Sequence, residues 1–157
     1  MNRCMHEAMQ REYSDNWPQI KEAMSRFLLS QPLALRTTNR IWMSHSLPAD
    51  RLMKDFDLSI FKKKIELQDC VKPGSAYILT WGRRMSQALL DRLANMLNVD
   101  IFLLGHQPQV TGWGQAGNNL LIIASDHNHG CLVHIDLEKS YAIDDLIRSV
   151  VPLSSIE

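Results

Sequence analysis

The chain has 157 residues, of which 45% are hydrophobic and 22% charged, and its seventeen basic residues balance seventeen acidic ones. This length is typical of one globular domain, and the composition excludes a disordered, collagen-like or low-complexity protein. A net charge of zero also argues against nucleic acid and anionic membranes as partners, because both select basic surfaces. We therefore expect a single globular domain over residues 1–157.

Three features bear on where the protein works. The longest apolar run, residues 120–124, is far shorter than the roughly 20 residues of a membrane-spanning helix. The amino-terminal residues turn polar and acidic where a signal peptide needs an apolar stretch. The cysteines Cys4, Cys70 and Cys131 are far apart and match neither a zinc ribbon nor a C-x-x-C motif. We therefore expect a cytoplasmic protein without a membrane segment.

Hydrophobic periodicity predicts helices and strands that alternate along the chain. Apolar residues recur at three- and four-residue intervals over 7–29, where Pro18 divides the pattern into two helices, and again over 85–97 and 144–151. Short apolar runs bounded by turn residues predict strands at 40–44, 77–81, 100–104, 120–124 and 131–137. The last two are expected to form an antiparallel hairpin, since the loop between them is too short for a crossover. We expect residues 48–74 to form loops and short elements. The alternation of predicted helices and strands along the chain indicates an α/β fold.

Two histidines follow directly after predicted strands. His45 ends the strand 40–44, and His106 follows the strand 100–104 across a glycine. Ligands of open α/β sheets gather at the carboxyl ends of the strands, where the backbone opens a crevice. A histidine held there can offer one imidazole nitrogen to a metal ion, although a hydrogen-bonded structural histidine is the more frequent case for either residue alone.

The residues around these histidines resemble the last two histidine motifs of calcineurin-like metallophosphoesterases, in particular the serine/threonine protein phosphatase branch. The resemblance extends in sequence order over roughly residues 15–140. It rests on short matching segments around the two histidines and on either side of them: FLLSQPL at 27–33, SHSL at 44–47, YILTW at 77–81, GHQ at 105–107, and the strand, Ser-x-x-Asn loop and strand at 121–136.

This resemblance implies a layered β-sandwich flanked by helices and a binuclear site containing Mn, Fe or Zn. His45 and His106 would both be ligands of one ion. The ions of such a centre lower the pKa of a bridging water and hold the phosphate for in-line attack. The implied substrate is a phosphorylated protein or a small phosphoester.

Other motifs of that family are absent from all 157 residues: D-x-H, G-D-x-x-D-R-G and G-N-H followed by an acid. They would supply the remaining metal ligands, a phosphate-binding arginine and a proton donor. The resemblance therefore implies the C-terminal half of a phosphoesterase domain, with no catalytic residue assigned and little activity alone. A non-catalytic binding module derived from such an enzyme is the alternative. Either form is expected to associate with itself or with a complementing N-terminal half, because half a sandwich exposes an apolar face.

A polar loop at residues 125–130 supplies the next candidates. The resemblance makes this loop a wall of the substrate pocket, with His127, Asn128 and His129 able to contact a phosphate, while the plain interpretation is a polar turn. The same loop, with Cys131 and His134, is a rival zinc site. Its spacing matches no recognised finger, and residues 131 and 134 would point to opposite faces of an extended strand.

Arginines close to the predicted strand 77–81 are the last candidates. Arg83 and Arg84 follow Trp81 directly, and a guanidinium group suits the geometry of a phosphate. Solvated charges at the start of a helix are the alternative. The apolar side chains Trp42, Trp81, Met43 and Met96 are expected in the core.

Overall fold

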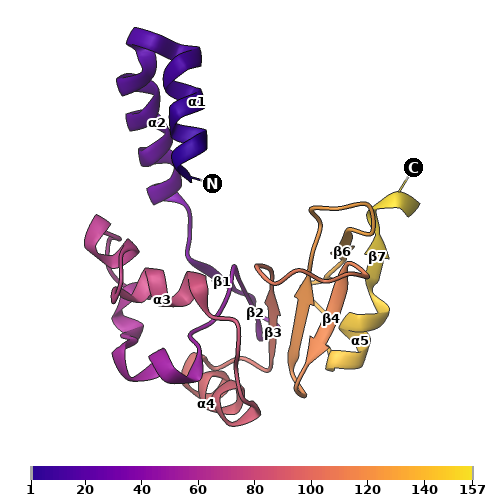
Figure 1. Ribbon diagram of the computed structural model, residues 1–157. Helices are drawn as coiled ribbons and strands as arrows, with labels where there is room; N and C mark the ends of the chain where they lie inside the picture. Colours follow the sequence, from indigo (N-terminus) through magenta and orange to yellow (C-terminus); the bar gives the residue numbers. More distant parts are fainter. Residues whose placement is uncertain (1, 157) are drawn as a thin grey trace. The chain divides into compact units, whose positions relative to one another are not determined.

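The structure is a computed structural model that describes residues 2–156. The chain divides into two compact units, Met1–Pro32 and Leu33–Glu157 (Figure 1). The second unit contains all the candidate site residues.

The first unit is a helical hairpin. It consists of α1 (Asn2–Tyr13), the 3-10 turn η1 (Ser14–Asn16) and α2 (Trp17–Ser30), and the two α-helices pack against each other. The predicted helix and its division are confirmed, because Pro18 lies in the first turn of α2, where its missing N–H costs no hydrogen bond. Trp17 is the buried side chain of this unit and lies edge-on to His6, with ring centroids 5.0 Å apart.

A five-stranded mixed sheet forms the centre of the second unit. Its strands are β1 (Ala34–Arg36), β2 (Ile41–Ser44), β3 (Ile101–Leu104), β4 (Trp113–Ala116) and β5 (Leu120–Ile123), in the spatial order β1-β2-β3-β5-β4. The central strands β2, β3 and β5 run parallel, whereas β1 and β4 are antiparallel to their neighbours. The carboxyl ends of three adjacent strands therefore meet at one edge.

Side chains alternate between the two faces of this sheet. Phe102 and Leu104 of β3 face a core shared with α4 (Gln87–Leu97) and with Leu79 of α3 (Ser75–Trp81). Ile101 and Leu103 face the opposite core, which contains Leu146 of α5 and side chains of β6 and β7. The bounds of these last elements are β6 (Cys131–Val133), α5 (Ile143–Arg148) and β7 (Val150–Pro152). The sheet is thus covered on both sides, which explains why its central strands are apolar throughout.

The structure corrects three predicted elements. Residues 77–81 are helical, since they belong to α3, which contains a backbone hydrogen bond from Ile78 N to Gly74 O of 3.0 Å. β6 does not pair with β5 in a hairpin but forms a separate two-stranded antiparallel sheet with β7. The predicted helix 144–151 ends at Arg148, and the β-branched pair Val150–Val151 continues as β7.

The remaining predictions agree with the structure to within a few residues. Residues 48–74 form the short 3-10 helices η2 (Asp50–Asp55), η3 (Leu58–Phe61) and η4 (Leu67–Cys70), and a further one, η5 (Leu153–Ser155), lies near the end of the chain. The helix predicted at 85–97 is α4, which Ser86 caps through its side chain and which the left-handed Asn98 ends. The strands β1 and β4 were not predicted.

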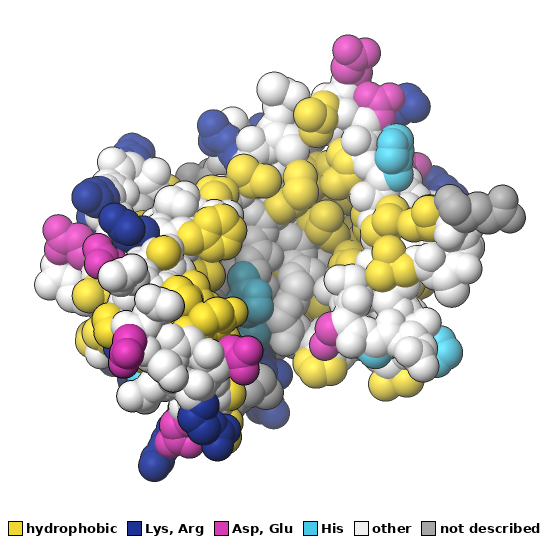
Figure 2. Space-filling view, turned by 90° about the horizontal axis from the view of Figure 1, so that it is seen from above, with side chains coloured by type: hydrophobic (Ala, Val, Ile, Leu, Met, Phe, Trp, Pro, Cys, Tyr) yellow, Lys and Arg dark blue, Asp and Glu magenta, His cyan; other side chains and the backbone are white. Residues whose placement is uncertain are grey.

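The mixed sheet and its helices confirm the α/β class. No helix within residues 2–156 has the length and apolar character needed to cross a membrane. Figure 2 shows Lys and Arg side chains interspersed with Asp and Glu on the face it presents, in line with the zero net charge.

Candidate functional site

His45 and His106 lie side by side at the carboxyl edge of the sheet. The register of the parallel strands pairs Ser44 of β2 with Leu104 of β3, so the residues that follow each strand are also neighbours. The Nε2 atom of His45 lies 2.8 Å from the Nδ1 atom of His106, although 61 residues separate them in sequence. The structure therefore brings together the two histidines that the resemblance implies as ligands of one ion.

The backbone of His106 is unusual. Its φ angle is +66°, in the left-handed region that few non-glycine residues adopt. Its second ring nitrogen, Nε2, is buried and has no hydrogen-bond partner among residues 2–156. A strained backbone of this kind persists only where the surrounding structure enforces it, and such positions cluster at functional sites.

Partly buried and buried hydrogen bonds hold the turn after β2, which presents His45. The Ser44 hydroxyl accepts from Trp42 Nε1 at 2.8 Å and donates to Ser46 O at 2.7 Å. The side chain of Ser46, which is 1% exposed, donates to the carbonyl of Gly82 at the end of α3. The turn that presents His45 is therefore tied to the segment that carries Trp81 and Arg83.

Trp81 and Arg83 border the histidine pair. The indole of Trp81 lies edge-on to the ring of His106, with centroids 5.8 Å apart. Burial lowers the pKa of both imidazoles, and the positive charge of the neighbouring Arg83 lowers the pKa of each further. For His106, the adjacent His45 also contributes to the lower pKa. Of the predicted substrate-binding residues, Arg83 is near enough for its charge to lower the pKa of both histidines.

His45 Nε2 and His106 Nδ1 are joined by a hydrogen bond, so one ion bound by both nitrogens would take the place of the proton between them. No cluster of three or more His, Cys, Asp or Glu side chains that could hold a metal occurs within residues 2–156. The described residues therefore offer two ligands at this point.

The loop after β5 leaves the sheet at the same edge, but one of its two histidines, His127, already makes hydrogen bonds through its ring. His127 Nδ1 accepts from the backbone N–H of His129 at 3.1 Å, and His127 Nε2 donates to the carbonyl of Gln109 at 2.8 Å. Both ring nitrogens of His127 thus serve to fold the loop against the segment that follows His106. The exposed side chains of Asn128 and His129 make no hydrogen bond with His45 or His106.

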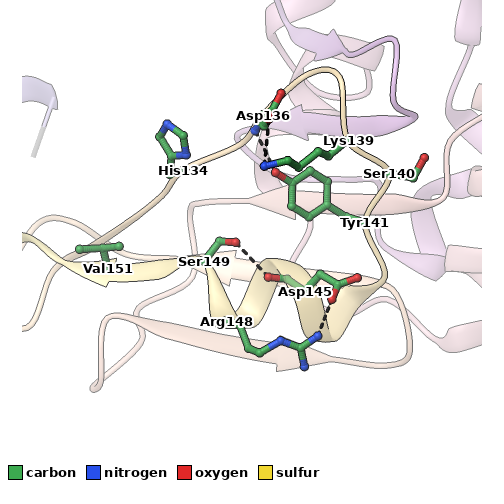
Figure 3. A pocket seen from close by; sticks show the side chains of 9 residues that line it. All are labelled: His134, Asp136, Lys139, Ser140, Tyr141, Asp145, Arg148, Ser149 and Val151. Carbon is green, nitrogen blue, oxygen red and sulfur yellow. Dashed lines mark hydrogen bonds and ion pairs between the residues drawn. The ribbon is translucent and has the colours of Figure 1, made fainter.

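The described residues do not bring together three ligands for the alternative zinc site at this loop. Cys131 is buried at the start of β6, where its thiol lies 3.4 Å from the carbonyl of His129. His134 is exposed and lines a different cavity, of about 630 Å³, together with two ion-paired carboxylates, Asp136 with Lys139 and Asp145 with Arg148 (Figure 3). This cavity lies beside α5 and contains neither member of the histidine pair.

Trp81 is the site residue that the sequence interpretation missed, because a strand at 77–81 placed it in the core. Its side chain is 54% exposed, and Met96, also predicted as core, is 42% exposed. A helical interpretation would have found Trp81: Tyr77 and Trp81 are four residues apart and share one helix face, while Ile78 and Leu79 are buried.

The comparisons with known proteins add no relative. The chain matches no protein-family model, no curated protein and no solved structure. Proposals about its function therefore depend on the geometry of the site.

Proposed function

We propose that this chain supplies part of the active site of a metal-dependent phosphoester hydrolase of the calcineurin-like type, in which His45 and His106 bind one divalent ion, Mn, Fe or Zn. The observation that carries the proposal is the 2.8 Å approach of His45 Nε2 to His106 Nδ1 at the carboxyl edge of two adjacent parallel strands. That edge is where α/β sheets bind their ligands.

The layering of the second unit supports the same proposal. The family's domain is a layered β-sandwich flanked by helices. In the second unit, β6 and β7 pack on one face of the five-stranded sheet, while α3 and α4 cover the other. We propose that these two sheets are part of such a sandwich.

Each of these residues at the carboxyl edge of the sheet would have a role that fits the chemistry of its side chain. His45 and His106 would hold the ion through the nitrogen atoms that face each other. When bound, the ion supplies positive charge to a phosphate and makes water a better nucleophile. Arg83 would bind phosphate oxygens, since its planar guanidinium can donate two parallel hydrogen bonds. Trp81 would exclude water from the side of His106 that it covers.

Two imidazoles are fewer protein ligands than the three of an ordinary catalytic zinc site. Within residues 2–156 no third ligand completes a cluster, so we propose that other ligands come from a complementing N-terminal half and that the chain alone hydrolyses phosphoesters poorly. The same observation favours the second candidate, a binding module derived from such an enzyme. The two candidates differ in whether a metal ion binds at His45 and His106.

Metal binding by the purified chain tests this difference. Titration with Mn²⁺ or Zn²⁺, followed calorimetrically, is expected to show weak binding of one ion, which His45→Ala and His106→Ala each abolish. His134→Ala is the matched control, since this exposed histidine lies at the other cavity, and it should bind metal as the parent chain does. Unchanged binding in both site variants would overturn the proposal, and loss of binding in His134→Ala would favour the zinc site at the 125–134 segment. Turnover of an aryl phosphate that His106→Ala abolishes would refute the expected low activity.

A further inference from the structure

A second, basic pocket includes Trp81, the residue that also borders the histidine pair. It has a volume of about 330 Å³, and its wall includes Arg51 and Lys54 of η2, Lys72, and the aromatic residues Tyr77 and Trp81 of α3. Trp81 borders both this pocket and the histidine pair, because its indole lies edge-on to the ring of His106. We call this cavity the basic–aromatic pocket.

The cations of the basic–aromatic pocket are not neutralised by the chain itself. The ion pairs formed within residues 2–156 involve none of Arg51, Lys54 and Lys72. Asp50, the acid adjacent to Arg51, instead accepts hydrogen bonds from the backbone and hydroxyl of Ser86, at 2.8 and 2.5 Å. Asp55 is the single carboxylate in the wall, so the wall carries an excess of positive charge in a chain whose net charge is zero.

The aromatic part of the wall suits a planar ring. Trp81 and Tyr77 lie with their centroids 6.0 Å apart and their planes inclined by 33°, and Trp81 is 54% exposed. A nucleobase stacks favourably on an exposed aromatic side chain, and cations bind the phosphates attached to it. The volume is at the lower end for small-molecule pockets, roughly 300–1,000 Å³, and favours a compact ligand over a long peptide.

We propose that the basic–aromatic pocket binds the part of a nucleoside polyphosphate that extends beyond the phosphate held at His45 and His106. The base stacks on Trp81, and a second phosphate is bound by Lys54, Lys72 and Arg51. This inference rests on the proposed function, since it names the substrate class of that site. Trp81 then acts as a specificity residue, because it contacts both the histidine that holds the metal and the ring of the substrate.

The test measures binding of ADP and of tripolyphosphate to the whole chain, by calorimetry in the presence of a metal chelator. ADP is expected to bind, and the double variant Lys54→Gln, Lys72→Gln should weaken its binding at least tenfold. The control variant Lys62→Gln, Lys64→Gln removes two exposed lysines of the same segment outside the pocket and should change ADP binding less than twofold. Trp81→Ala should weaken binding of ADP at least fivefold and of tripolyphosphate, which has no ring, less than twofold.

Three results would overturn this proposal: no ADP binding by the folded parent chain, equal weakening by the two lysine pairs, or tighter pocket-dependent binding of an acidic phosphopeptide than of ADP. A cooperative thermal transition for each variant separates loss of binding from loss of folding. His45→Ala distinguishes the two proposals. It removes the metal ligand without touching the pocket wall, so Mn²⁺ binding should be lost while metal-free ADP binding stays within twofold.

Discussion

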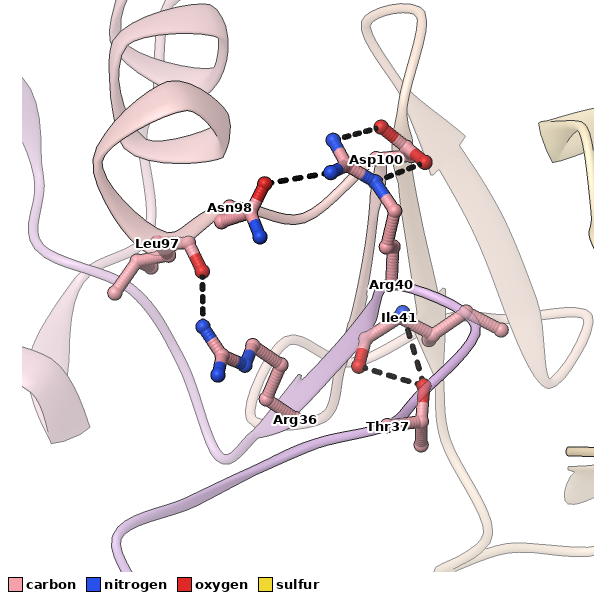
Figure 4. Close-up of polar contacts among 7 residues, drawn as sticks. All are labelled: Arg36, Thr37, Arg40, Ile41, Leu97, Asn98 and Asp100. Carbon is pink, nitrogen blue, oxygen red and sulfur yellow. Dashed lines mark hydrogen bonds and ion pairs between the residues drawn. The ribbon is translucent and has the colours of Figure 1, made fainter.

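Arg40 and Asp100 join the starts of β2 and β3 through two parallel hydrogen bonds, from Arg40 Nε to Asp100 Oδ2 and from Arg40 Nη2 to Asp100 Oδ1, each 2.7 Å long (Figure 4). The same guanidinium donates to Asn98 Oδ1 at 2.5 Å. This ion pair of Arg40 and Asp100 lies at the opposite end of the strands from His45 and His106. It supports the register on which the approach of the two histidines depends.

The first prediction concerns the ion pair of Arg40 and Asp100. Arg40→Gln should lower the melting temperature measurably, and Arg40→Lys should recover only part of the loss, because an ammonium group cannot make both parallel bonds. Both side chains are about half exposed, so the difference between parent and Arg40→Gln should shrink in about 1 M salt, where surface charges are screened. Melting curves at low and high salt check this, and a difference that does not depend on salt would show that Arg40 acts through packing.

The left-handed backbone of His106 leads to the second prediction. A residue with a Cβ atom at φ +66° carries a conformational cost that glycine does not. His106→Gly should therefore be more stable than His106→Ala by about 1 kcal/mol, although both variants lose the proposed metal ligand. Unfolding in urea measures the two free energies of unfolding. Equal stability of the variants would mean that the backbone relaxes at this position and is not held in place by its surroundings.

Much of the central unit could be predicted from the sequence because its patterns are unambiguous. The strands β2, β3 and β5 are apolar runs with turn residues at their ends, and α4 has a helical apolar face between a serine cap and a left-handed asparagine. From parallel strands in this order, the position of His45 beside His106 follows directly. In these segments the local sequence pattern and the tertiary structure favour the same element.

The errors arise where a segment's pattern suits more than one kind of element. Residues 77–81 are apolar and aromatic, which suits a short buried strand as well as a helix with one buried face. The choice is settled by packing against η4 and the sheet, which the sequence does not display. Similarly, β6 is three residues long, and its pairing with β7 depends on contacts across the second core. The basic–aromatic pocket was missed for the same reason, since its wall comes from residues 48–81.

The third prediction concerns acid stability. Asp69 accepts hydrogen bonds from Lys63 Nζ at 2.7 Å and from the backbone N–H of Glu66 at 3.0 Å, and these bonds lower the pKa of its carboxyl. A carboxylate with a lowered folded-state pKa stabilises the fold fully above its unfolded pKa of about 3.9, and this contribution is lost as the pH falls through the folded-state value.

Asp69→Asn should therefore lower stability at neutral pH and flatten the fall in stability below about pH 4. Free energies of unfolding measured from pH 7 downward check this. The matched control is Asp144→Asn, since Asp144 is exposed and makes no side-chain hydrogen bond or ion pair within the described chain. A parallel acid dependence in Asp69→Asn and the parent would contradict the assignment.

The last prediction compares two glycines that flank the site. A Cβ atom on Gly82 would lie 1.6 Å from the carbonyl oxygen of Leu47, a backbone atom of the turn that presents His45. A Cβ atom on Gly105 would meet nothing closer than 3.9 Å. Gly82→Ala must therefore separate the 81–83 segment from the 45–47 turn, whereas Gly105→Ala fits.

We expect Gly82→Ala to lower the free energy of unfolding by about 1–3 kcal/mol, the usual cost of overpacking, and Gly105→Ala to leave it within about 0.5 kcal/mol. Because Gly82 lies between Trp81 and Arg83, the first variant should also weaken both Mn²⁺ and ADP binding, while the second should change neither. Urea unfolding and the two titrations measure these effects on the same samples. If Gly82→Ala binds both ligands as the parent does, the contact between the two segments does not position the site, and the shared role of Trp81 fails with it.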